Sequence, residues 1–222
     1  MSIEDRPLLP FGPFSAAFEP GELNVPGYLT LLHMDGSDCR VVIQRIRKAL
    51  HANDAREFIV KLLSDSNWRP HLVSAVAVML SKDPGEFSSA LWSAVDTGSW
   101  VAPQLIATLA LTDPEFVANA KHHIELRCPV SVSVDLSPLK RHSATGPAGI
   151  QHRSAKNLAA LAALLGRIPA SAAWLQSEIA HAEVTHLLEA DRDSSGLIAQ
   201  GWLDALSGQF AALDIALPRP AV

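Results

Sequence analysis

A short segment near the C-terminal end carries the pattern that comes closest to a metal site. The run EIAHAEVTH, from Glu178 to His186, contains two Glu-x-x-His steps, Glu178 with His181 and Glu183 with His186. On a helix, side chains three positions apart point the same way, so each step places a carboxylate beside an imidazole. Both groups are ligands for zinc and iron. Glu178 and His181 are therefore the candidate metal ligands.

The Glu-x-x-His step resembles the ligand step of ferritin-like di-iron bundles. That resemblance implies the same step on two different helices, with a further Glu from each of two more helices. Here both steps fall within one predicted helix, five residues apart, and so about 140° apart around it. They cannot share one ion, and we expect no metal and no other cofactor.

The other reactive residues form no known catalytic motif. Cys39 and Cys128 lie far apart, and Cys128 follows His122 and His123 closely, but nothing near them supplies a third catalytic group. No phosphate-binding loop, dinucleotide-binding glycine motif, HExxH motif or paired CxxC motif occurs. These observations favour a protein that is not an enzyme and whose thiols are reduced.

Composition is that of a globular protein. The 222 residues fit one large domain or two small ones, and 48% hydrophobic with 18% charged residues supports a sizeable core. A net charge of −5 argues against a whole-chain attraction to nucleic acid. The N-terminal segment lacks a signal-peptide pattern, and no apolar run is long enough to span a membrane. We expect a cytoplasmic protein.

One segment occurs twice in the middle of the chain. The first copy, SNWRPHLVSAVAVMLSKDPGEF, covers 66–87, and the second, GSWVAPQLIATLALTDPEF, covers 98–116. Each has a Trp near a Pro, then an apolar run rich in small residues, then Asp-Pro. The runs predict helices buried on more than one side. Asp83 and Asp113 are predicted N-caps, and Glu86 is predicted to complete a capping box with Asp83.

This layout resembles HEAT and armadillo repeats, with Trp68 and Trp100 in equivalent positions. The resemblance implies an all-α fold of stacked antiparallel helical hairpins, an α-solenoid, with about nine helices. An ordinary bundle with two similar hairpins is the alternative. The repeat core is predicted over 37–126, within a single domain that covers 36–222.

Residues 1–35 are predicted to form an extended arm. The segment contains five prolines, which disfavour helix, and Phe11, Phe14 and Phe18, which favour packing. We expect the arm to pack on the first helices of its own chain. The alternative is an arm that swaps onto a second subunit, which would make a homodimer.

An irregular insertion at 127–153 separates the repeat core from C-terminal helices at 154–213. Its first half alternates apolar and polar residues and predicts a short strand or extended loop. Residues 127–156 hold five Lys or Arg and one Asp, and loops of this length are often functional, disordered or plain connections. The residues predicted to contact a partner are Arg127, Lys140, Arg141, His142, Arg153 and Lys156.

Helical repeats usually hold another macromolecule. The leading hypothesis is therefore a non-enzymatic protein–protein interaction module, either an adaptor or an inhibitor of the immunity-protein type. One alternative is a helical metal-dependent enzyme that uses its Glu and His residues. Another is a HEAT-like nucleic-acid binder that uses the basic residues at 40–48 and the insertion.

Overall fold

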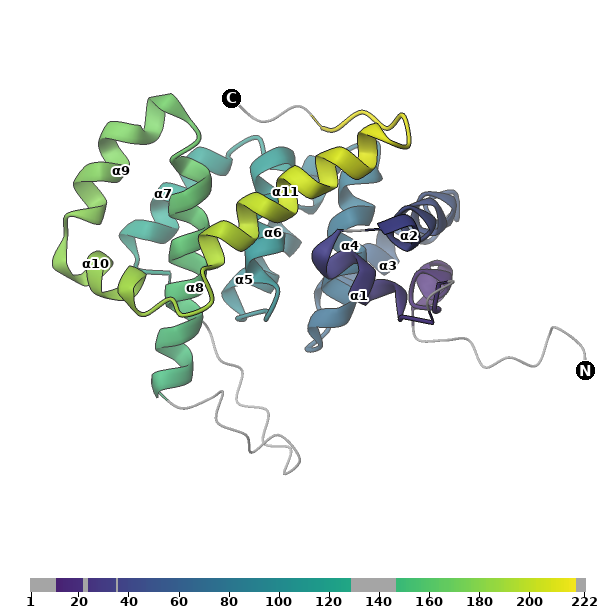
Figure 1. Ribbon diagram of the computed structural model, residues 1–222, viewed down its shortest axis with the longest axis horizontal. Helices are drawn as coiled ribbons and strands as arrows, with labels where there is room; N and C mark the ends of the chain where they lie inside the picture. The colour runs from purple at the N-terminus through teal and green to yellow at the C-terminus, as the bar shows by residue number, and fades with distance from the viewer. Residues whose placement is uncertain (1–10, 22–23, 35, 129–146, 219–222) are drawn as a thin grey trace, which may run out of the picture.

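The computed structural model describes residues 11–21, 24–34, 36–128 and 147–218, and these residues form eleven α-helices and no strand (Figure 1). The all-α prediction is confirmed. The helices are α1 (Gly27–His33), α2 (Gly36–Ala49), α3 (Ala55–Leu63), α4 (Trp68–Leu80), α5 (Ser88–Asp96), α6 (Ala102–Thr112), α7 (Phe116–Glu125), α8 (Pro147–Leu165), α9 (Ala172–Ile179), α10 (Ala182–Glu189) and α11 (Ser195–Ala211). None of them is long and apolar enough to cross a membrane.

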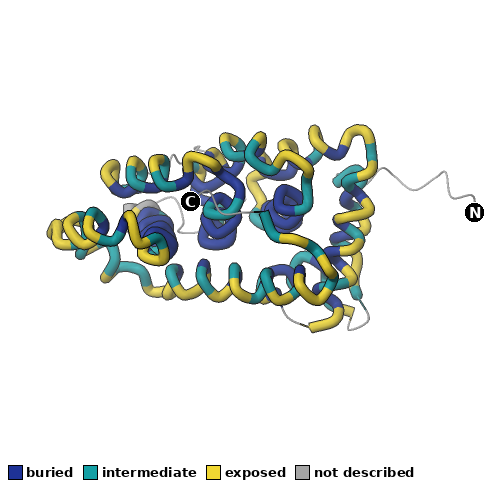
Figure 2. The backbone as a smooth tube through the Cα atoms, turned by 90° about the horizontal axis from the view of Figure 1, so that it is seen from above, coloured by how far each residue is buried: buried dark blue, intermediate teal, exposed yellow. Residues whose placement is uncertain are grey.

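Helices α4, α6 and α8 form the buried centre of the molecule, where α6 packs between the other two (Figures 1 and 2). Every residue of 70–79 in α4 and of 102–109 in α6 is buried. An amphipathic helix would bury one stripe only, whereas these helices are predominantly apolar and are covered on all sides. The repeated apolar runs are thus buried on more than one side, as predicted.

The outer helices pack against this central row. Helix α3 contacts α4, α5 contacts α6, and α7 contacts α8. Their apolar stripes supply large buried side chains such as Leu91, Phe116 and Ile124. Antiparallel pairs stacked in this way are compatible with the helical-repeat layout.

Helix α11 crosses the other side of the central row and contacts both α6 and α8 (Figure 1). Two of its side chains also reach the end of α1, because Trp202 Nε1 donates to the carbonyl of Leu31 at 2.8 Å and Gln209 Nε2 donates to the carbonyl of Met34 at 2.9 Å. The last carbonyls of a helix lack intrahelical donors. Helix α11 therefore supplies hydrogen-bond donors to carbonyls at the end of α1, from residues 171 and 175 positions further along the chain.

The described part of the predicted arm is helical rather than extended. Residues Gly12–Ala17 form a 3₁₀ turn, with Pro13 in its first turn and Phe14 fully buried, and α1 follows directly after Pro26. Proline is compatible with the first turn of a helix because no hydrogen bond from its nitrogen is needed there. The prolines therefore position short helices here instead of preventing them.

The C-terminal helices differ from the prediction at two places. Helix α8 begins at Pro147, ahead of the predicted start at Ser154, and the predicted strand lies outside the described residues. The single helix predicted to carry the run from Glu178 to His186 is divided into α9 and α10. The hydroxyl of Thr185 donates to the carbonyl of Ile179 at 2.7 Å. In a continuous helix, that carbonyl would accept from the amide four residues later instead.

The two Asp-Pro turns also differ from each other. Asp113 Oδ1 accepts the amide of Glu115 at 3.0 Å, but Glu115 is itself the N-cap of α7, so this bond closes the turn before the helix and the predicted N-cap at Asp113 is wrong. Asp83 makes no capping bond with its side chain. Glu86 does not complete a capping box, because its carboxylate accepts from Arg56 of α3 at 2.8 Å. An ion pair between helices has replaced the local motif.

Candidate functional site: an aromatic face and an adjoining pocket

The candidate metal ligands Glu178 and His181 lie within ion-pair distance of each other, and Glu178 also pairs with an arginine. Glu178 Oε2 lies 3.6 Å from Arg127 Nη1, and Glu183 lies 3.4 Å from Arg127 Nε. His181 Nε2 is 3.8 Å from the other oxygen of Glu178. Across the residues that the structure describes, no group of three or more His, Cys, Asp or Glu is placed to hold a metal ion.

The predicted partner-binding residues do not form one cluster in the described structure. Arg127 is engaged by the two glutamates, and Arg153 is half-buried on α8. Lys140, Arg141 and His142 lie outside the described residues. Lys156 is buried, with its Nζ 3.1 Å from the carbonyl of Trp100 and 3.3 Å from Asp193 Oδ2. The basic residues at 127 and 156 therefore make internal contacts.

Three aromatic side chains from separate helix starts form a row on the surface. The ring of Tyr28 meets Trp68 edge-on with centroids 5.7 Å apart, and Trp68 meets Trp100 at 4.9 Å. Trp100 is 54% exposed, although Trp is ordinarily well buried. The two tryptophans mark equivalent repeat positions in the sequence, and repeat stacking brings them into contact. We call Tyr28, Trp68 and Trp100 the aromatic face.

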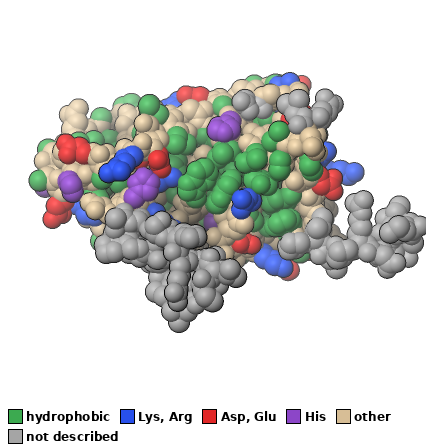
Figure 3. Space-filling view, turned by 60° about the horizontal axis from the view of Figure 1, so that its bottom comes forward, with side chains coloured by type: hydrophobic (Ala, Val, Ile, Leu, Met, Phe, Trp, Pro, Cys, Tyr) green, Lys and Arg blue, Asp and Glu red, His purple; other side chains and the backbone are tan. Residues whose placement is uncertain are grey.

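Two cations lie over this aromatic face. The guanidinium of Arg69 lies 5.5 Å from the ring of Tyr28 and 5.1 Å from that of Trp68. Lys156 Nζ lies 5.3 Å from the ring of Trp100. Lys156 is neutralised by Asp193, whereas exposed Arg69 pairs with no carboxylate in the described part of the chain. A space-filling view shows a surface where hydrophobic side chains gather with basic ones beside them (Figure 3).

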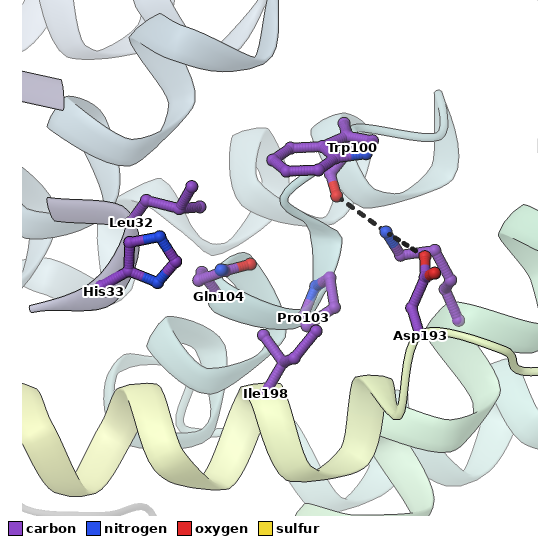
Figure 4. A pocket seen from close by; sticks show the side chains of 8 residues that line it. Leu32, His33, Trp100, Pro103, Gln104, Asp193 and Ile198 are labelled. Carbon is purple, nitrogen blue, oxygen red and sulfur yellow. Dashed lines mark hydrogen bonds and ion pairs between the residues drawn. The ribbon is translucent and has the colours of Figure 1, made fainter. Parts of the chain in front are cut away.

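A pocket of about 340 Å³ adjoins the aromatic face (Figure 4). Helices α1, α6, α8 and α11 and the turns before α6 and α11 meet there. Asp193 fixes the turn before α11, because it contacts both Lys156 and His152 one turn apart on α8. The lining residues are Leu32, His33, Trp100, Pro103, Gln104, Lys156, Asp193 and Ile198.

Two potential nucleophiles lie elsewhere and are held in structural roles. Burial raises the pKa of Cys128 to about 12, so its thiol stays protonated and unreactive at neutral pH. Ser99 Oγ lies 2.7 Å from His71 Nδ1, the spacing of a nucleophile and its base. His71 is only 3% exposed, and the Ser99 hydroxyl also accepts the amide of Val101, so the pair secures the turn before α6.

The site therefore combines aromatic rings, a guanidinium held against two of them, and a pocket lined by four apolar and four polar residues. Of these residues, sequence reasoning predicted only Lys156 as a binding residue and placed Trp68 and Trp100 at equivalent repeat positions. It missed Tyr28, whose partners Trp68 and Arg69 lie about 40 positions further along the chain. Comparison with protein-family models, curated proteins and solved structures finds no match for this chain.

Proposed function

We propose that this chain is a non-enzymatic protein-binding module whose partner docks on the aromatic face. The observation that carries the proposal is the row of Tyr28, Trp68 and Trp100, with Arg69 stacked on the first two rings. Tyr, Trp and Arg are the residue types that dominate binding energy at protein interfaces.

The electrostatics of the face define the partner's chemistry. Arg69 lacks a carboxylate in the described structure, and its guanidinium is already held in place by two rings and by a hydrogen bond to the hydroxyl of Tyr28 at 3.2 Å. A preorganised guanidinium loses little entropy when it binds a carboxylate. The partner therefore presents an acidic side chain next to an apolar one.

An adaptor and an inhibitor of the immunity-protein type both fit this proposal, because each acts through a stoichiometric protein complex. Nucleic-acid binding is a weaker candidate. On α2, Arg40 donates to Gln209 and Arg45 donates to two carbonyls of the N-terminal segment. Those two cations hold the fold together, and the chain is acidic overall.

The first test is affinity capture of partners with the full chain from a lysate of the organism that encodes it. A double variant, Arg69→Glu with Trp100→Ala, should lose the protein that the wild type captures in stoichiometric amount. With the purified partner, calorimetry should show a loss of affinity of about 30-fold or more, since a central Trp is typically worth about 2 kcal/mol.

The matched control is Lys121→Glu with Trp174→Ala. These two residues form another contact between a cation and a ring, with Lys121 Nζ 5.0 Å from the centre of the Trp174 ring. They do not belong to the aromatic face. This variant should bind like the wild type. Equal binding by both double variants would contradict docking on the aromatic face. A further variant, Lys140→Glu with Arg141→Glu, tests the basic insertion separately, and unchanged affinity would remove that insertion from the interface.

A further inference from the structure

Gln104 is a buried polar residue whose side-chain amide has no hydrogen-bond partner among the described residues. The residue as a whole is only 4% exposed. Its nitrogen and oxygen are directed into the pocket, between Leu32, Trp100 and Ile198 (Figure 4). Neither atom is sealed off from solvent, so the contents of the pocket, water or a ligand, can pair with both of them.

In the other repeat copy, the buried polar side chain at the equivalent position has hydrogen-bond partners within the protein. Gln104 follows Pro103 as His71 follows Pro70, with the same apolar run after each. Both ring nitrogens of His71 are occupied, by Ser99 Oγ at 2.7 Å and by the carbonyl of Asp65 at 2.9 Å. In one repeat the buried polar side chain therefore forms hydrogen bonds within the protein. In the other repeat the equivalent side chain faces a pocket.

The surroundings of Gln104 restrict what can bind. Leu32, Trp100, Pro103 and Ile198 supply apolar surface, and Trp100 offers an exposed ring. Lys156 is the one Lys or Arg among the lining residues and is already paired with Asp193 at 3.3 Å, so the pocket does not demand an anion. Its volume of about 340 Å³ lies at the small end of ligand pockets, which run from about 300 to 1,000 Å³.

We propose that this pocket binds a small uncharged molecule that joins a carboxamide or lactam group to a flat apolar body. The Gln104 amide, which has both a donor and an acceptor, pairs with the carboxamide, and the flat body lies against Trp100 and Ile198. This ligand site goes beyond the protein-binding function and does not depend on it.

Benzamide is a suitable probe, with acetophenone and benzoate as matched comparisons. Acetophenone replaces the amide NH₂ by a methyl group, and benzoate replaces it by a charged oxygen. Binding to the full-length protein is followed by NMR titration of the side-chain amide signals. We expect benzamide to bind with a Kd on the order of 1 mM and to shift the Gln104 signals, and the two comparisons to bind more weakly.

Gln104→Leu should weaken benzamide binding about tenfold, which is the effect expected for two lost hydrogen bonds. Trp100→Ala should weaken it independently, and this exposed position is not needed for the core. Gln176→Leu, at an exposed position on α9, should change nothing.

Equal binding of all three probes, unchanged binding by Gln104→Leu, or no shift at about 10 mM benzamide would overturn the proposal. Binding of N-acetylphenylalanine amide but not of benzamide would overturn it too, because the pocket would then receive a segment of a protein partner. Loss of partner capture by Arg69→Glu leaves this test unaffected, so the two proposals fail separately.

Discussion

At the scale of single residues, His123 is held in a way that only its protonated form satisfies. Nδ1 lies 2.8 Å from the carbonyl of Asn119, and Nε2 lies 3.0 Å from Asp96 Oδ1. Both partners are acceptors, so both ring nitrogens must carry hydrogen. The ring of His123 also stacks on the ring of Trp92, with the two centroids 4.2 Å apart. The indole N–H of Trp92 in turn donates to the carboxylate of Asp113. This network joins α5, α7 and the turn between α6 and α7.

Burial by itself would lower the pKa of His123, but its hydrogen bonds to Asp96 and Asn119 outweigh burial and raise the pKa. A group whose pKa is raised by folding stabilises the protein fully below its unfolded pKa of about 6.5. That contribution is lost as the pH rises through the folded pKa.

We therefore predict that Asp96→Asn destabilises the protein most below about pH 6.5, and that its difference from wild type shrinks at alkaline pH. Urea unfolding from about pH 5.5 to 8.5 measures this difference. An NMR titration that placed the pKa of His123 at or below its unfolded value of about 6.5 would contradict the prediction.

At the scale of elements, the contact between α8 and α11 depends on one glycine. A Cβ at Gly196 would lie 2.9 Å from the Cβ of Ala163 and 3.0 Å from the carbonyl of Ala159. Both distances are shorter than normal contacts, and the carbonyl belongs to a rigid helix backbone. The small residues of α8 and this glycine let the two helix axes approach closely.

Gly196→Ala should therefore lower the free energy of unfolding by about 1–2 kcal/mol, since overpacking exceeds the gain in helix propensity. Gly201 and Gly208 lie on the same helix, and a Cβ at either would meet no atom within 4 Å. Alanine at each should stabilise the protein by about 0.5–1 kcal/mol. Chemical denaturation measures all three, and equal effects would show that α8 and α11 are not in tight contact.

At the scale of the whole molecule, α11 runs across the central row from α8 to α1 (Figure 1). It covers α6 and α8 of the central row and hydrogen-bonds to α1 through Trp202 and Gln209. The broad surface that an open helical stack would offer is thus partly covered by the chain's own helix. The aromatic face and the pocket lie beside this covered area, where α1, α6 and α11 meet.

Trp202→Phe keeps an aromatic ring but removes the indole N–H that binds the carbonyl of Leu31, together with part of the buried indole. We expect a loss of about 1–3 kcal/mol in the free energy of unfolding, because a buried acceptor loses its donor. Trp174→Phe, at a half-buried tryptophan on α9, should cost less than about 1 kcal/mol. Thermal unfolding compares the two variants, and a loss no larger for Trp202→Phe would contradict the role of α11 in closing the fold.

The sequence by itself determined the features that depend on neighbours along the chain. The apolar runs after Trp68 and Trp100 predicted two helices buried on more than one side, and the Asp-Pro steps predicted where they end, because burial periodicity and helix breaking are local properties. The two-copy pattern likewise predicted paired helices in an all-α fold.

Only the tertiary structure decided which polar side chains pair with other residues of the chain and which remain available to a ligand or a partner. It placed Lys156 against Asp193, Arg127 against two glutamates, and Tyr28 beside Trp68. It also gave both ring nitrogens of His71 hydrogen-bond partners within the protein and left the amide of Gln104 facing a pocket. These outcomes depend on contacts between distant positions, which leave no periodic signal in the sequence, so residue type and spacing could not reveal them.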